Sequence, residues 1–131
     1  MLKLKTISAP QEINSAALQE RYYKGSSQKT HDFIALSDDA EVGLLIYEDW
    51  GNLEGLIYEI FVLSNFRKLG VGNWILSQAE DIAAGFGHTK IRLDARTLDR
   101  HQMSHNDLAT WYQSKGYFWL NSEIGRLEKA L

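Results

Sequence analysis

The hydrophobic pattern of the chain changes its period across the segment NFRKLGVGN, residues 65–73. Before it, residues 55–63 (GLIYEIFVL) form a continuous apolar run rich in β-branched and aromatic side chains, which indicates a central, buried strand. From Val71 onwards the apolar side chains fall at helical intervals, at Ile75, Ala79, Ile82 and Phe86. The chain therefore has to pass from a buried strand into an amphipathic helix through this glycine-containing segment.

Gly70 and Gly72 form the N-terminal approach to that helix. The first amides of a helix have no partner inside the helix, and the helix dipole favours an anion there. Without a Cβ on either glycine, phosphate oxygens can approach the backbone closely, and Arg67 and Lys68 add positive charge. The alternative is a plain strand-to-helix turn, but the combination of strand, glycines, helix and cations favours a phosphate-bearing ligand.

Two common phosphate-binding signatures do not fit this segment. The dinucleotide fingerprint needs a third small residue three positions after Gly72, where the chain has Ile75. The mononucleotide P-loop needs Gly-Lys-Ser/Thr, whereas Gly72 is followed by Asn73 and Trp74. The ligand is therefore expected to be neither a dinucleotide nor a nucleotide held by a P-loop.

The remaining patterns predict a mixed sheet covered by helices. The expected strands are residues 2–8, 32–37, 42–48, 55–63 and 90–95, with a turn at residues 38–40. The expected helices are a stretch opened by Pro10 with Ile13, Ala17 and Leu18 on one face, the helix from Val71 closed by Gly85 and Gly87, and a helix capped by Ser104 and Asp107 and ended by Gly116. The segments YFWLN and RLEKAL are expected to end the chain as a hairpin.

The composition narrows the classes of function. The 131 residues fit one domain, and the absence of cysteine excludes disulfides, thiolate zinc sites and cysteine nucleophiles. The net charge of −3, without a run of Lys or Arg, argues against a nucleic-acid partner. The first ten residues lack the apolar core of a signal peptide, and no run approaches a membrane span, so we expect a cytoplasmic chain with no membrane partner. His101 and His105 lack an obvious third ligand, so no metal is expected.

The segment Arg67-Lys68-Leu69-Gly70-Val71-Gly72, preceded by Ile60–Val62, resembles the acetyl-CoA signature of the GNAT superfamily of N-acetyltransferases, Arg/Gln-x-x-Gly-x-Gly/Ala after a hydrophobic strand. The segment WYQSKGY (residues 111–117) is similar to the family's aromatic-Tyr-x-x-x-Gly-aromatic segment, and RLEKAL resembles its closing strand. The resemblance implies that residues 1–131 form one acyl-CoA N-acyltransferase domain of mixed α/β class. Its sheet would be mostly antiparallel and twisted, with a splayed parallel strand pair and helices on both faces.

The resemblance also implies where acetyl-CoA, as cosubstrate, would bind. Its pantetheine arm would lie between the splayed strands 55–63 and 90–95. Main-chain groups of Ile60, Phe61 and Val62 would hold its amides and thioester, and the backbone amides of Lys68, Leu69, Gly70, Val71, Gly72 and Asn73 would hold the pyrophosphate. The family's CoA-binding asparagine falls seven residues before Tyr112, at His105, with Asn106 beside it. Asn106 is the expected contact, and His105 is the alternative.

The implied reaction is direct attack of a neutral primary amine on the thioester, in a ternary complex. Such a reaction needs an oxyanion donor, for which an N–H near Val62 is expected, and a proton source for the thiolate. Tyr112 is the candidate acid, because the family's tyrosine there lies near the sulfur and a phenol is protonated at neutral pH. The alternative is that Tyr112 is only a core residue beside Leu108 and Trp111.

The candidate general base is Glu59, with Glu54 as the second choice. Many relatives place their acidic residue one position earlier, at Tyr58 here, and a shift of one residue in a strand changes the face. A chain of water molecules, or a purely structural ion pair of Glu59, is the alternative. Trp50, Tyr22 and Tyr23 are either acceptor-pocket residues or scattered core and surface aromatics.

The amine acceptor is a small molecule or a peptide. The segments FVLSNFRKLGVG and NSEIGRL resemble the diamine and polyamine acetyltransferase branch, which suggests a polyamine-type amine first. Because the N-terminal part is short, the acceptor site is either open or completed by a second subunit in a homodimer. Two alternatives in other classes are a non-catalytic acyl-CoA-binding or regulatory module and an unrelated nucleotide-binding domain.

Overall fold

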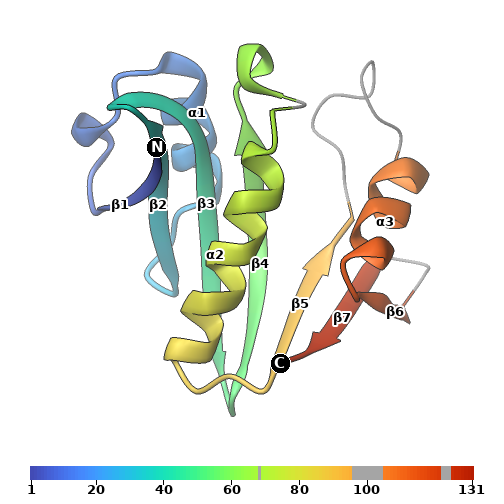
Figure 1. Cartoon of the computed structure of the whole chain (residues 1–131). Helices are drawn as coiled ribbons and strands as arrows, with labels where there is room; N and C mark the ends of the chain where they lie inside the picture. Colours follow the sequence, from blue (N-terminus) through green and yellow to red (C-terminus); the bar gives the residue numbers. More distant parts are fainter. Residues whose placement is uncertain (68, 96–104, 122–124) are drawn as a thin grey trace.

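A computed structural model describes residues 1–67, 69–95, 105–121 and 125–131 of the chain, residues 105 and 106 by their backbone alone. Within these ranges seven strands form one sheet in the order β1-β2-β3-β4-β5-β7-β6 (Figure 1). The strands are β1 (Leu2–Ile7), β2 (Thr30–Ser37), β3 (Ala40–Gly51), β4 (Glu54–Val62), β5 (Lys90–Asp94), β6 (Phe118–Asn121) and β7 (Arg126–Ala130). The α-helices are α1 (Ala16–Gly25), α2 (Val71–Gly85) and α3 (His105–Ser114), and two short 3-10 turns are η1 (Pro10–Glu12) and η2 (Ser64–Phe66).

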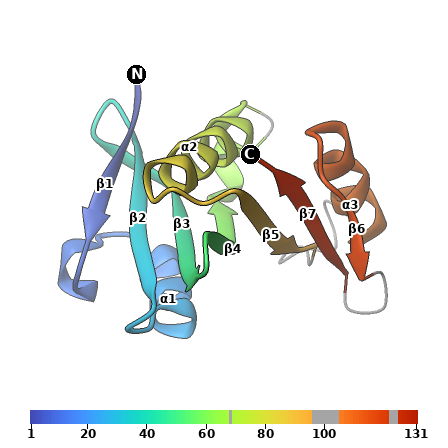
Figure 2. The same cartoon turned by 90° about the horizontal axis from the view of Figure 1, so that it is seen from below.

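The sheet is covered on both faces, as the sequence predicts. Figure 2 shows α2 and α3 on one side of the sheet and α1 on the other. The larger core cluster lies on the α2 side and includes Ile75 of α2, Tyr112 of α3 and Leu93 of β5. The smaller cluster packs Leu18 of α1 against Ile46 of β3. The mixed α/β class is confirmed, with a mostly antiparallel sheet that contains one parallel pair, β4 and β5.

The N-terminal helical stretch differs from its prediction. Instead of one helix from Pro10, the chain forms the short turn η1 and then begins α1 at Ala16, with Ser15 as the N-cap. The break is held by the carboxylate of Glu41, which accepts hydrogen bonds from the backbone N–H groups of Asn14 and Ser15 at 2.6–3.1 Å. A carboxylate at this position satisfies amides that would otherwise lack partners. The predicted cap of α3 by Ser104 lies outside the described residues.

The parallel pair of strands opens into a wedge. β4 pairs with β5 only from Glu54 to Ile57, opposite Lys90 to Leu93. Residues 58–62 of β4 continue beyond that point, and Figure 1 shows the two strands diverging toward the start of α2. One edge of β4 is thereby left without a strand partner among the described residues, while its other edge stays paired with β3.

Three buried tyrosines make the stability of this fold sensitive to alkaline pH. Burial raises the pKa of Tyr47, Tyr112 and Tyr117, and for Tyr117 the nearby Glu80 carboxylate adds to the rise in pKa. In the unfolded chain a phenol has a pKa of about 10. The stability that these protonated phenols give the folded protein is therefore fully present below about pH 10 and is lost as the pH rises beyond it. We expect the free energy of unfolding in urea to be level from pH 7 to 9 and to fall above pH 10; a level curve through pH 11 would contradict this.

Candidate functional site

The glycine turn opens α2 with uncapped amides. Gly70 is the N-cap residue and has φ of 82°, a left-handed conformation that favours glycine, and no side chain caps the helix there. Its carbonyl accepts the N–H of Trp74 at 3.1 Å, which is the first hydrogen bond of the helix. The amides of the first turn that come before Trp74 therefore have no partner within the helix. At Gly72, an added Cβ would meet only Val62 Cγ2, at 4.0 Å. No described protein atom therefore requires glycine at position 72, and the space beside its backbone is open to a ligand.

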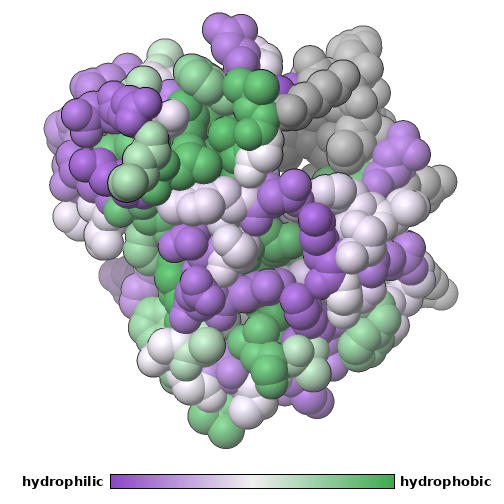
Figure 3. Space-filling view, viewed as in Figure 1, coloured by the Kyte–Doolittle hydropathy of each residue, from purple (hydrophilic) through white to green (hydrophobic). Residues whose placement is uncertain are grey.

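The open edge of β4 lies next to this turn. Leu63 donates its N–H to the carbonyl of Val42 on β3 at 2.9 Å. Because N–H groups alternate in direction along a strand, the N–H of Val62 points to the opposite edge, where β5 has diverged. Figure 3 shows apolar surface gathered at this end of the molecule, where partly buried Leu63 and Phe66 and exposed Leu69 lie. The opening thus offers backbone hydrogen-bonding groups beside an apolar wall.

The Arg67 side chain contacts the end of β4. Its Nε donates to the carbonyl of Val62 at 3.0 Å, and its guanidinium lies 5.6 Å from the ring centre of Phe61. The Arg67 side chain therefore links the end of η2 to the end of β4. Lys68, the second expected cation, lies outside the described residues.

A β-bulge decides which face of the sheet Glu59 occupies. In the pairing of β3 with β4, Ile46 opposes Glu59 and Tyr47 opposes Ile57, so Tyr58 is the extra residue. Tyr58 and Glu59 both lie on the α1 face, since Tyr58 closely approaches Gly25 and Glu59 binds Arg21, both on α1. The bulge lies where the pairing with β5 ends, at the mouth of the wedge.

Glu59 is held by an ion pair, one of the alternatives that the sequence left open, and its partner is Arg21. Both carboxylate oxygens bind Arg21, from Nε at 2.8 Å and from Nη2 at 2.7 Å, and the two side chains are 8% and 23% exposed. The Glu59 carboxylate raises the pKa of Arg21 through this hydrogen bond. Arg21 lies 38 residues away on α1, and nothing in the local pattern of α1 indicates its partner. The arrangement gives Glu59 a structural role, whether or not it also accepts a proton.

Replacing Glu59 with glutamine is expected to destabilise the protein by roughly 1–3 kcal/mol, because the partly buried charge of Arg21 would lose its counter-charge. The matched control is Glu20→Gln, which breaks an exposed pair with Lys24 on the same helix and is expected to cost below about 0.5 kcal/mol. Urea unfolding of both variants measures the difference. Equal losses would show that the Arg21–Glu59 pair does not anchor α1.

The other acidic and aromatic candidates have structural partners. Glu54 binds Arg92 at 2.9 Å, and Arg92 also binds Glu128 at 2.7 Å, at the end of β4 that stays paired with β5. Trp50 donates from Nε1 to Glu48 and lies against the guanidiniums of Arg92 and Arg126. Tyr22 and Tyr23 both belong to α1, where Tyr22 is buried and Tyr23 is exposed. In the ranges described, no three His, Asp or Glu side chains are grouped so as to hold a metal ion.

Tyr112 lies in the core on the α2 side of the sheet. Its ring packs edge-on against Trp111 and Tyr117, with ring centres 4.8 and 5.7 Å apart, and it is 7% exposed. Burial raises the pKa of its hydroxyl, which is therefore protonated throughout the neutral range. Both interpretations of Tyr112, proton donor and core residue, agree with this placement. Asn106 lies in the first turn of α3, and its side chain is outside what the structure describes.

Together these features define a class of protein: an α/β domain whose sheet opens between two parallel strands beside a glycine-initiated helix. The same fold occurs in an IAA acetyltransferase from Bacillus cereus, with 18% identity, a TM-score of 0.73 and 100% of both chains covered. It also occurs in a GNAT family acetyltransferase from Elizabethkingia anophelis with acetyl-CoA bound, with 16% identity, a TM-score of 0.67 and 99% and 98% of the two chains covered. A third example is the PaiA N-acetyltransferase from Thermoplasma acidophilum in complex with coenzyme A, with 12% identity, a TM-score of 0.68 and 100% and 99% covered.

The family model described as acetyltransferase (GNAT) domain matches residues 28–117. The chain therefore belongs to the GNAT acetyltransferase family. No curated protein gave a significant match to the sequence. Among the helices in the described part of the chain, none has the length and apolar character needed to cross a membrane.

Proposed function

We propose that the protein is an N-acetyltransferase that moves the acetyl group of acetyl-CoA to a primary amine by direct attack in a ternary complex. The observation that carries the proposal is the open backbone at Gly72, beside the unpaired edge of β4. A phosphate group can approach the first amides of α2 there, and an amide-bearing arm can bond to the strand edge. Binding would use main-chain groups of residues 60–62 and amides of residues 68–73, with Asn106 as a further contact.

We propose catalytic roles for three groups. The N–H of Val62, which points into the wedge, would donate to the oxyanion that develops when the amine attacks the thioester carbonyl. Tyr112, protonated at neutral pH, would donate its proton to the departing thiolate. The proton of the attacking amine would pass to Glu59 or to water, and use of Glu59 requires Arg21 to release one carboxylate oxygen.

Thermal unfolding in the presence of acetyl-CoA, CoA, ATP and NAD tests the binding half of the proposal. At a hundred times its dissociation constant, a ligand stabilises the folded state by about 2.7 kcal/mol, which corresponds to a rise in Tm of roughly 3–8 °C for a domain of this size. We expect this rise with acetyl-CoA and CoA alone. No rise with either, in a folded sample, would contradict the proposed binding site.

The acceptor we propose is a small amine, with diamines and polyamines to be tested first, because of the likeness of residues 61–72 and 121–127 to that branch. Release of free CoA thiol, measured with a panel of diamines, amino acids, aminoglycosides and peptides, would rank the acceptors. A non-catalytic acyl-CoA-binding module is the second candidate, and the engagement of both Glu59 oxygens by Arg21 favours it. That module would bind CoA and release no thiol with any amine.

We also propose that the protein forms a homodimer through β6. This strand lies at the end of the sheet, and its Phe118, Trp119 and Leu120 are 52%, 41% and 47% exposed. An edge strand with apolar side chains is a template for pairing, and a second copy offers the same edge antiparallel to it. We expect Trp119→Lys to reduce the solution mass from about twice 15.0 kDa to a single chain, and Tyr23→Lys on α1 to leave it unchanged. Light scattering measures the mass; a monomeric wild type would contradict the proposal.

A further inference from the structure

The peptide that joins Phe61 to Val62 is held by the sheet from one side. Toward β3, these two residues oppose Leu44 and Gly43. Toward β5, the pairing of β4 ends at Ile57. The N–H of this peptide is that of Val62, which points into the wedge. Contacts other than strand pairing must therefore fix its direction on that side.

One side chain, that of Arg67, contacts both neighbours of this peptide. The chain turns through η2, whose C-cap is Arg67, and so returns this residue to the end of β4. There Arg67 Nε donates to the Val62 carbonyl at 3.0 Å, while its guanidinium carbon lies 5.6 Å from the ring centre of Phe61, within cation–π range. The guanidinium of Arg21 approaches the same ring, at 5.9 Å. Arg67 thus brackets the peptide, through the ring that precedes it and the carbonyl that follows it.

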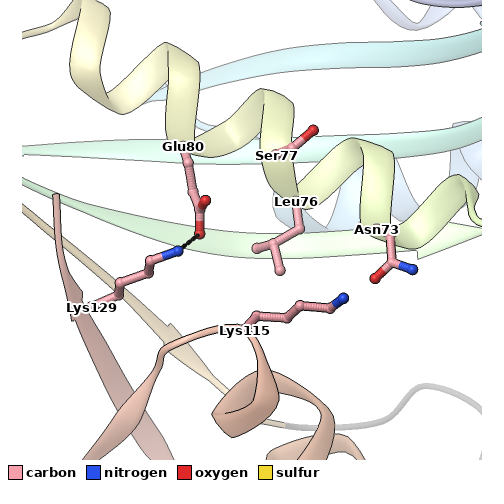
Figure 4. A pocket seen from close by; sticks show the side chains of 6 residues that line it. All are labelled: Asn73, Leu76, Ser77, Glu80, Lys115 and Lys129. Carbon is pink, nitrogen blue, oxygen red and sulfur yellow. Dashed lines mark hydrogen bonds and ion pairs between the residues drawn. The ribbon is translucent and has the colours of Figure 1, made fainter.

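The Arg67 guanidinium lies on the α1 face of the sheet. Phe61, which it covers, packs on the core cluster of that face, whereas Val62 packs on the cluster of the α2 face. The first turn of α2 is on the Val62 side, where a Cβ on Gly72 would lie 4.0 Å from Val62 Cγ2. Figure 4 shows a pocket of about 200 Å³ on that same side, and Arg67 is not among its lining residues. The position of Arg67 favours a role at the strand end over one as a cation for phosphate.

We propose that Arg67 is a positioning residue, which fixes the Phe61–Val62 peptide so that the Val62 N–H points at the thioester oxygen of acetyl-CoA. The inference rests on the proposed function, because that function makes this N–H the oxyanion donor. A donor stabilises the developing charge best when its direction is set before the reaction and nothing has to turn. The group of Arg67 that acts is the Nε–H and not the positive charge, since the Val62 carbonyl requires only a hydrogen-bond donor.

Three substitutions of Arg67 separate the N–H group from the charge. Glutamine carries its amide nitrogen on Cδ, as arginine carries Nε, so Arg67→Gln keeps a donor at the same distance along the side chain and removes the charge. Arg67→Lys keeps the charge but places a methylene where Nε stands. Arg67→Met places a methyl group there and has neither feature. A positioning role therefore requires the glutamine variant to behave as the wild type, whereas a phosphate cation requires the lysine variant to do so.

NMR of the full chain bound to acetyl-CoA, labelled with ¹³C at the thioester carbonyl, tests the inference without an acceptor. A hydrogen bond to the thioester oxygen polarises the carbonyl and moves its resonance downfield from that of free acetyl-CoA. We expect equal displacement in the wild type and Arg67→Gln, and loss of at least about half of it in Arg67→Met and Arg67→Lys. Calorimetric affinity for acetyl-CoA should stay within about threefold in all four proteins, because no phosphate contact is lost.

Turnover with an amine acceptor gives a second readout. We expect kcat of Arg67→Met to fall about tenfold with little change in KM for acetyl-CoA, less than the roughly 10²–10³-fold that removal of an oxyanion donor costs, because the Val62 N–H is kept but less well directed. Arg67→Gln should recover most of this loss. A fall in affinity with an unchanged kcat is the pattern of a binding cation instead.

The matched control is Lys90→Met, which removes a positive charge from an exposed position at the start of β5 and should change neither the resonance nor the affinity. Equal displacement in all the Arg67 variants, or none in the wild type, would overturn the assignment of Arg67 and leave the proposed binding of acetyl-CoA standing. Weaker binding by the glutamine and methionine variants, with the lysine variant unaffected, would also overturn it. If the wild type does not bind acetyl-CoA, the proposed function itself is wrong.

Discussion

Replacing Gly72 with leucine is expected to weaken coenzyme A binding by about 30-fold or more and to leave the fold intact. The added Cβ would meet no described protein atom closer than 4.0 Å, so the folded protein can accommodate it. The same side chain would occupy the space through which phosphate oxygens reach the first amides of α2. A hydrogen bond to a charged group contributes roughly 1.5–3 kcal/mol, and loss of one such bond alone accounts for a change of this size.

The matched control for this variant is Gly85→Leu, at the last residue of the same helix, where an added Cβ also meets nothing within 4 Å. Both substitutions replace a helical glycine with a better helix former, so neither is expected to lower Tm. Calorimetric titration with coenzyme A should separate them, with the loss of affinity confined to the Gly72 variant. Tight binding by Gly72→Leu would show that the ligand does not approach this backbone.

The features near the glycine turn could be predicted because each depends on neighbouring residues. The helical spacing of Ile75 and Ala79 predicts α2, and the structure begins that helix at Val71, as predicted, with Gly70 as its N-cap. The continuous apolar run before it predicts the buried strand, found as β4 (Glu54–Val62). The two short segments YFWLN and RLEKAL predict the closing hairpin, which is found as β6 and β7.

The features that depend on residues far apart in the chain could not be predicted in this way. The break between η1 and α1 depends on Glu41, and the orientation of Glu59 depends on a bulge and on Arg21. No periodic sequence pattern identifies Glu41 or Arg21 as a partner, because a single hydrogen-bonding side chain can come from any element that the fold brings close.

The largest expected effect on turnover belongs to Tyr112→Phe, which should lower kcat by about 10²–10⁴-fold and leave coenzyme A affinity within about twofold, on the scale of general acid catalysis. The substitution keeps the ring and its contacts with Trp111 and Tyr117, so packing is preserved. Because burial raises the pKa of Tyr112, its hydroxyl holds its proton below about pH 10, and turnover should not fall in that range through its ionisation.

The control for Tyr112→Phe is Tyr117→Phe, which removes a neighbouring buried hydroxyl that donates to Glu80 at 2.9 Å. Glu80 would remain bound to Lys129, so we expect a loss of stability of about 1 kcal/mol and little change in kcat. If removal of either hydroxyl changes only stability, Tyr112 is a core residue and the proton reaches the thiolate from water. If thiol release is undetectable even in the wild type, while coenzyme A still binds, the non-catalytic module is the better description. A large effect on kcat confined to Tyr112 is the outcome that only a proton donor at the sulfur explains.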